Sequence, residues 1–156
     1  MTGSWHYRSM ADDSWTIQGQ QADAGLTPVR CIIGEWTGEG YCHGEAVTGR
    51  MHGAAVIDGS WIEVEETLVG ADGSVVHTDR SLYRFNVEAE ALEAIQLFER
   101  ASMTTSLVES TDDGFRWITG PGAPQLRFFV EGDRLRYTVI LPGDDAPAAE
   151  MTYERA

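Results

Sequence analysis

Short runs of alternating apolar and polar residues follow one another from about residue 29 to the end of the chain. In the run over residues 62–68, Ile62, Val64 and Leu68 share one face, whereas Glu63 and Glu65 share the other. The same alternation recurs over residues 83–88, 126–130, 134–141 and 151–155. A period of two is typical of β-strands with one buried face. The pattern therefore predicts roughly eight to ten short strands.

Turn-forming dipeptides separate these runs. They are Asp58-Gly59, Asp72-Gly73, Asp113-Gly114, Gly132-Asp133 and Gly143-Asp144. Such dipeptides favour the tight turns of β-hairpins. Many short strands joined by hairpins predict an all-β fold, either a sandwich or a barrel.

The segment Val87–Phe98 is ambiguous, because its Glu and Ala residues favour a helix. The residues on both sides of Glu88–Ala91 have strand character, so a turn there would join two strands. We favour the hairpin, because tertiary context often overrides local propensity.

The first strand carries a family resemblance. Its residues Ile32–Gly40 include Gly34 and Trp36, and Arg155 lies in the last strand. A Gly-x-Trp near the start and a basic residue on the last strand resemble the calycin superfamily, which includes lipocalins, fatty-acid-binding proteins and nitrobindins. The longer Gly-x-Trp-x-Gly-x-Gly pattern is closest to the nitrobindin-like branch and to related bacterial barrel families of unknown function.

This resemblance implies a single closed antiparallel up-and-down β-barrel over residues 29–156, with a ligand-sized cavity. It also gives Gly34, Trp36 and Arg155 structural roles. The indole of Trp36 would close one end of the barrel, and the guanidinium of Arg155 would lie across its face. Residues 1–28, with Trp5, His6, Tyr7 and Trp15, lack a sustained period. We expect them to form an arm or lid with one short helix over an end of the barrel, the alternative being a partly disordered terminus.

The resemblance also bears on whether the chain binds haem, because nitrobindins bind haem through a histidine near the C-terminus. This chain has no histidine after His77. We therefore expect no haem bound in that manner and no other cofactor.

The amino-acid composition argues against some classes of binding partner. The 156 residues fit one domain, and the net charge of −14 disfavours nucleic acid and anionic membranes. Cys31 and Cys42 are too few for a disulfide framework. We see no signal peptide or apolar span, so we expect a cytoplasmic protein, with a homodimer as a reasonable assembly.

Cys42, His43 and His52 match no metal-site spacing, so we expect no metal. Adjacent residues of a strand point to opposite faces, so Cys42 and His43 would not form a nucleophilic pair. His52 would line the cavity in one register of its strand, whereas Met51, Ala55 and Ile57 would face inward in the other.

The carboxylates and aromatic residues supply the candidate site. Glu63 and Glu65 fall on the expected solvent face, whereas Glu66 falls on the apolar face. A lone inward acid usually pairs with an arginine or binds a polar group of a ligand. The expected ligand-binding residues are His52, Glu66, Tyr83, Phe85, Phe98, Trp117, Phe128, Tyr137 and Tyr153, and the catalytic candidates are His52, Glu66 and Tyr83.

Three functions are compatible with such a barrel. The first is binding of a small apolar molecule, oriented at its polar end by the tyrosines with His52 or Glu66. The second is a cofactor-independent isomerase or cyclase, which predicts a desolvated His or Glu beside another polar group. The third is a packed interaction module, which predicts no cavity above roughly 300 Å³.

Overall fold

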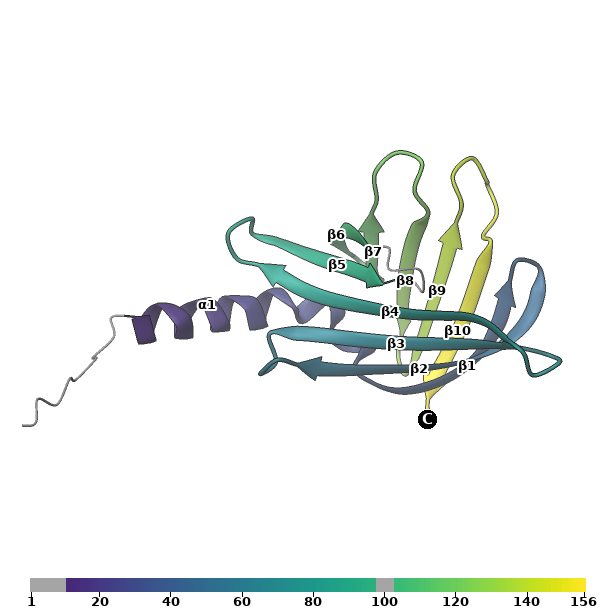
Figure 1. Ribbon diagram of the computed structural model, residues 1–156, viewed down its shortest axis with the longest axis horizontal. Helices are drawn as coiled ribbons and strands as arrows, with labels where there is room; N and C mark the ends of the chain where they lie inside the picture. The colour runs from purple at the N-terminus through teal and green to yellow at the C-terminus, as the bar shows by residue number, and fades with distance from the viewer. Residues whose placement is uncertain (1–10, 98–102) are drawn as a thin grey trace, which may run out of the picture.

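The computed structural model describes the backbone of residues 11–97 and 103–156, and the side chains of these residues from residue 18 onward. Ten strands make up most of the described chain (Figure 1). They are β1 (Gly34–Cys42), β2 (Glu45–Val56), β3 (Trp61–Gly70), β4 (Val75–Asn86), β5 (Ala91–Leu97), β6 (Met103–Thr111), β7 (Gly114–Ile118), β8 (Gln125–Glu131), β9 (Arg134–Ile140) and β10 (Ala149–Arg155).

The strands form one closed antiparallel barrel. Each strand pairs with its neighbours in sequence, and β1 also pairs with β10, so the sheet has no free edge. Trp36 of β1 lies opposite Arg155 of β10 in this closing pair. The predicted all-β, closed, up-and-down barrel of eight to ten strands is confirmed, at the upper end of that range.

The hairpins fall where the sequence indicates them. Each of the five turn dipeptides lies at or beside a connection between two successive strands. Residues 87–90 form the turn between β4 and β5, so the hairpin favoured over a helix in this segment is confirmed as far as Leu97. Phe98 lies outside the described residues.

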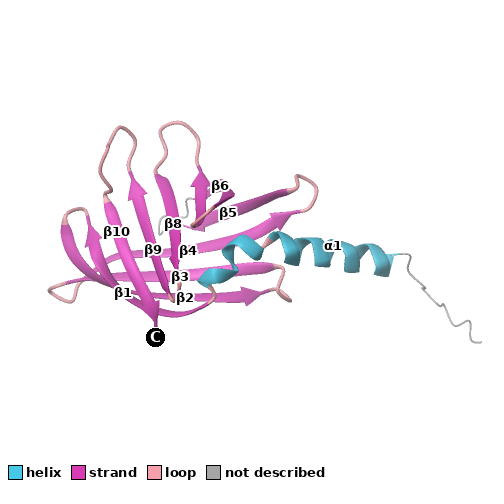
Figure 2. Ribbon diagram, turned by 180° about the vertical axis from the view of Figure 1, so that it is seen from behind, coloured by secondary structure: helices cyan, strands magenta, loops and turns pink. Residues whose placement is uncertain are grey.

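Two helical segments precede the barrel. Helix α1 (Ala11–Gly25) is longer than the short helix expected in the arm, and it leads away from the barrel (Figure 1). The 3-10 helix η1 (Thr27–Ile32) follows it and leads into β1 (Figure 2). Leu26, Val29 and Ile32 are fully buried, so this segment closes one end of the barrel. Trp5, His6 and Tyr7, and the side chain of Trp15, lie outside the described residues.

Alternation along the strands defines the inner face. Ile62, Val64, Glu66 and Leu68 of β3 are buried, whereas Glu65 is exposed. In the part of the chain that the structure describes, no helix combines the length and apolar character needed to cross a lipid bilayer.

Candidate functional site

Glu66 is a carboxylate in the interior of the barrel. It lies on β3 between the buried residues Val64 and Leu68, and its exposed fraction is 8%. The hydroxyl groups of two tyrosines from the C-terminal part of the sequence contact the Glu66 carboxylate. Tyr137 of β9 donates a hydrogen bond to Oε2 at 2.9 Å, and Tyr153 of β10 donates one to Oε1. Three strands thus converge on one buried acid.

The surroundings of Glu66 shift its ionisation. Burial raises the pKa of the Glu66 carboxyl to about 7, although the hydrogen bonds from Tyr153 and Tyr137 oppose the rise. The charge of Asp79 adds to it. Burial and the Glu66 charge together hold the pKa values of Tyr137 and Tyr153 well above their usual range, so both phenols remain protonated donors. Near neutral pH the Glu66 carboxyl can therefore either accept or release a proton.

Asp79 is a second carboxylate beside Glu66. The two residues are cross-strand partners on β3 and β4. Ser81 donates a hydrogen bond from Oγ to Asp79 Oδ2 at 3.0 Å. Oδ1 of Asp79 is buried and accepts no hydrogen bond from any residue that the structure describes. A buried acceptor without a donor costs about 1–3 kcal/mol, so such a group marks a place where a donor is missing.

Aromatic rings form a continuous row around the lumen. Trp117 donates from Nε1 to the Tyr83 hydroxyl oxygen at 3.3 Å, and burial raises the pKa of Tyr83. The ring-to-ring contacts have centroid distances of 6.0 Å for Tyr83–Phe115, 4.5 Å for Phe115–Phe128, 5.4 Å for Phe128–Tyr137 and 6.3 Å for Tyr137–Tyr153. This row fills much of the barrel and fixes the phenol groups in position.

A cavity of about 70 Å³ remains between these groups. Its polar lining comes from Glu66, Asp79, Ser81, Tyr83, Tyr137, His77 and Gln96, and its apolar lining includes Trp117, Phe128 and Val139. A water molecule needs roughly 10–15 Å³ of such a cavity, so there is room for about five groups of that size. It is smaller than the roughly 300 Å³ at which ordinary ligand pockets begin.

Five of the expected ligand-binding residues meet at this cavity: Glu66, Tyr83, Trp117, Phe128 and Tyr137. Tyr153 reaches the same place through its bond to Glu66. Phe85 is partly buried on the same side of β4, but its ring lies against Gly25 of α1 rather than at the cavity. Glu63 and Glu65 lie on the outer side of β3 and pair with Arg80, as expected for a solvent face.

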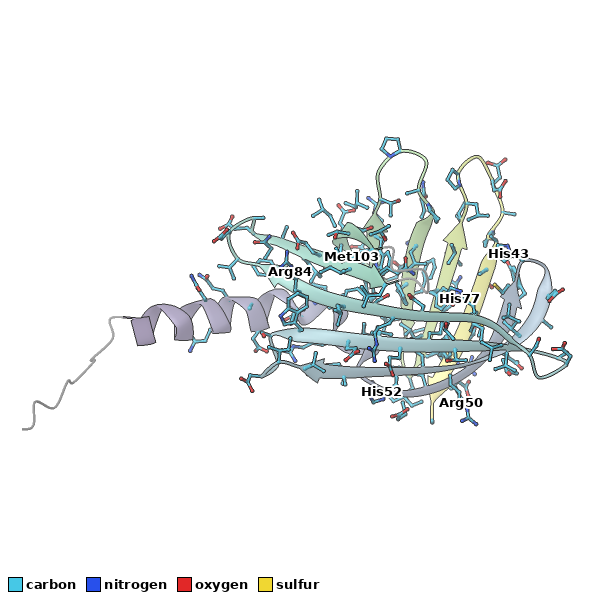
Figure 3. The ribbon with its side chains drawn as sticks, in the orientation of Figure 1. His43, Arg50, His52, His77, Arg84 and Met103 are labelled. Carbon is cyan, nitrogen blue, oxygen red and sulfur yellow. The ribbon has the colours of Figure 1, made fainter. Side chains whose placement is uncertain are left out.

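The inward orientation considered for His52 is wrong. Met51 and Gly53 are buried on β2, so the alternation places His52 outside, where Nδ1 lies 2.6 Å from Glu35 Oε1. Figure 3 shows His52 and Arg50 together on the outside of the barrel. The alternative register is adopted only in part, because Met51 faces inward but Ala55 and Ile57 are exposed. His52 therefore takes no part in the lumen.

Sequence reasoning missed Asp79, Ser81, His77 and Gln96 as residues of the cavity. The first three lie at alternate positions N-terminal to Tyr83 on β4. Extending the alternation backward from Tyr83 reaches them, but residues 77–81 are all polar and give no apolar pattern to follow. The pairing of β4 with β3 places these three residues beside Glu66, and the pairing of β5 with β4 places Gln96 beside Ser81.

Trp36 and Arg155 bind the segment that closes one end of the barrel. Trp36 Nε1 donates to the Ile32 carbonyl at 3.0 Å. The Arg155 guanidinium lies 4.4 Å from the centre of the indole and donates to the Ile33 carbonyl at 3.0 Å. Gly34 has a φ of 139°, and a Cβ there would overlap Arg155 Nη1, so only glycine fits.

Cys42 is buried, whereas His43 is exposed in the turn before β2. Among the described residues, no three His, Cys, Asp or Glu side chains cluster as metal ligands would. A comparison of the sequence with protein-family models finds no match, and neither does a comparison with curated proteins.

Proposed function

We propose that this chain is a calycin-like barrel, closest to the nitrobindin-like branch, and that it binds a small molecule in its lumen. Two features support the family assignment. The barrel is closed and antiparallel, and the Trp36–Arg155 pair lies where the resemblance implies it. We further propose the cytoplasm as its location, in keeping with free thiols at Cys31 and Cys42.

The observation that carries the binding proposal is the buried Glu66 carboxyl beside a cavity. Burying an ionisable group is costly, and perturbed groups in cavities cluster at functional sites. Glu66, Asp79 and the phenols would orient the polar end of a ligand, and Trp117 and Phe128 would contact its apolar part. The volume of about 70 Å³ restricts the ligand, or the part of it that enters, to a few non-hydrogen atoms.

Native mass spectrometry of the freshly purified chain tests this proposal, beside the variant Val139→Phe. Val139 lines the cavity and is only partly buried, so a larger ring there fills the space with little disturbance of the core. A co-purified mass that the wild type carries and the variant lacks is the expected result. An absorption spectrum of the same sample reports on haem, since a Soret band would contradict the expectation that none is bound.

If neither protein carries a ligand, a screen of small fragments by NMR completes the test. Fragments that shift the indole signal of Trp117 in the wild type, but not in Val139→Phe, support the lumen site. No fragment effect in either protein would leave the packed interaction module as the better description, because the cavity lies below the roughly 300 Å³ expected of a ligand pocket.

One observation favours the second candidate, a cofactor-independent isomerase or cyclase. The Glu66 pKa of about 7 suits a general acid or base at neutral pH. Such an enzyme moves protons at carbon, so exchange of acetone hydrogens for deuterium is a minimal assay that fits the cavity. Faster exchange with the wild type, abolished in Glu66→Gln, would support catalysis, and equal exchange in both would argue for binding alone.

A further inference from the structure

The charges around the cavity have one sign. Glu66 and Asp79 are neighbouring carboxylates on β3 and β4, and both line the space. None of the described residues that line it is Arg or Lys, and His77 is the single basic side chain among them. An anionic ligand would therefore meet two acids and no compensating arginine.

The carboxylates of the site also leave one hydrogen-bond acceptor without a donor among the described residues. The Glu66 oxygens each accept a bond from a tyrosine, and Asp79 Oδ2 accepts one from Ser81. Asp79 Oδ1 is buried without a donor. An ammonium group carries donors and no acceptor, so it would satisfy Oδ1 without leaving an acceptor of its own unpaired.

The apolar wall is suited to a cation as well. Trp117, Phe128, Tyr83 and Tyr137 line the cavity, and the faces of aromatic rings attract positive charge. Elsewhere in this protein the ring faces of Trp36 and Phe129 are occupied by arginines. Within the described residues, no guanidinium contact of that kind is found at the four rings of the cavity.

We propose that the cavity binds a small organic cation, a protonated amine, whose ammonium group lies between Glu66 and Asp79 and whose carbon atoms contact the aromatic wall. This inference rests on the proposed lumen site and names the chemical class of its ligand. The overall charge of −14 acts in the same direction, because it raises the local concentration of cations.

The test compares four probes on the wild-type chain at pH 8 by calorimetry and by NMR. They are n-propylamine, its neutral match propan-1-ol, its anionic match propionate, and calcium ion. We expect n-propylamine to bind at least about tenfold more tightly than propan-1-ol. Propionate is expected not to bind, and calcium is expected not to displace the amine.

Variants then locate the contacts. Asp79→Asn and Glu66→Gln keep the shapes of the side chains but remove their charge, and each is expected to lower n-propylamine affinity about tenfold and to reduce the preference for n-propylamine over propan-1-ol. The matched control is Glu35→Gln, which removes one charge from the exposed partner of His52. It is expected to leave both affinities as in the wild type.

The outcomes separate this inference from the proposed function. Equal affinity for propan-1-ol and n-propylamine, or displacement of the amine by calcium, would overturn the amine assignment while leaving a lumen site. The failure of all four probes to affect the wild type differently from Val139→Phe would overturn the amine and the lumen site together. The comparison of probes on the wild type stands even where a variant fails to fold.

Discussion

Glu66 ties the stability of the protein to pH. Its pKa is about 7 in the folded chain against an ordinary value of 4.5, so the folded state binds this proton more tightly than the unfolded state. The free energy of unfolding therefore falls as pH rises from about 4.5 to about 7, and the loss is complete above that range. A shift of this size corresponds to about 3 kcal/mol. Burial is the main cause of the raised pKa of Glu66; the hydrogen bonds from Tyr153 and Tyr137 oppose the rise, and the charge of Asp79 adds to it.

Urea unfolding of the wild type and Glu66→Gln at pH 5 and pH 8 measures this effect. The difference in unfolding free energy between the two proteins is expected to change by about 2.5 kcal/mol in favour of the variant at the higher pH. Glu39→Gln, on an exposed position of β1, serves as the control for loss of one surface charge. A pH-independent difference would show that Glu66 ionises normally in the folded protein.

Gly49 has no side chain and so leaves room for the Tyr153 hydroxyl group that donates a hydrogen bond to Glu66. A Cβ at this position of β2 would overlap the Tyr153 hydroxyl oxygen and come within 2.8 Å of Met151 Cε. Gly49→Ala is therefore expected to push the phenol away from Glu66 and to cost about 1–3 kcal/mol of stability, as overpacking in a core does. Chemical denaturation measures the loss.

Gly120→Ala is the matched control, because nothing lies within 4 Å of a Cβ at that loop position. Its stability is expected to stay within about 0.5 kcal/mol of the wild type. Equal stability of both variants would mean that β2 shifts to admit the methyl group and that the phenol contact does not depend on Gly49.

Single residues show which inward-facing positions the hydrophobic pattern of the sequence could predict. The inward position of Glu66 was predictable, because it shares a face with Ile62, Val64 and Leu68. Asp79 was not, since a polar residue in a polar run has no periodic signal. For His52 the pattern left two registers open, and the choice came from the pairing of β2 with β1, which places His52 opposite Glu35.

The segment between β4 and β5 shows why an element with helical propensity forms a hairpin. Arg84 donates to Glu93 at 2.7 Å and Asn86 donates to the same carboxylate at 3.1 Å, which joins the two strands across the turn. Asn86 Oδ1 also accepts a bond from the Ala89 backbone N–H. These long-range partners offset the local preference of the Glu and Ala residues for a helix.

Two side chains bind backbone carbonyls at the C-terminal end of helix η1, which closes one end of the barrel. Trp36 and Arg155 bind the carbonyls of Ile32 and Ile33, and the guanidinium stacks on the indole. Lysine lacks the planar fork, so Arg155→Lys is expected to lose the stacking and the carbonyl bond, at about 1 kcal/mol. Thermal unfolding measures the loss.

Arg134→Lys is the control on the neighbouring strand, because Arg134 forms an exposed ion pair with Glu154. Its midpoint is expected to match that of the wild type. If the two variants unfold at the same temperature, the stacked arginine contributes no more than a surface ion pair.

The small size of the cavity is a property of the whole barrel. Ten strands enclose a wide lumen, and the width grows with strand number. Here six large aromatic side chains fill it: Tyr83, Phe115, Trp117, Phe128, Tyr137 and Tyr153. The sequence predicts all of these residues except Phe115 at the cavity, but whether they fill the lumen or line it depends on rotamers and ring contacts, which alternation does not specify.

The charge of the whole molecule leads to a last prediction. The chain has 25 acidic and 11 basic residues, and the described arginines of the strands form mostly exposed ion pairs that each contribute little. Self-repulsion among the acidic residues is then expected to outweigh the stabilisation from these ion pairs.

Raising sodium chloride from about 10 mM to about 1 M shortens the screening length from about 30 Å to about 3 Å. The urea midpoint at pH 7 is therefore expected to rise with salt, and to rise less in a variant carrying Glu39→Gln and Glu45→Gln, both on exposed positions of β1 and β2. A midpoint that falls with salt would mean that the arginine pairs, although exposed, stabilise the fold more than the excess acids destabilise it.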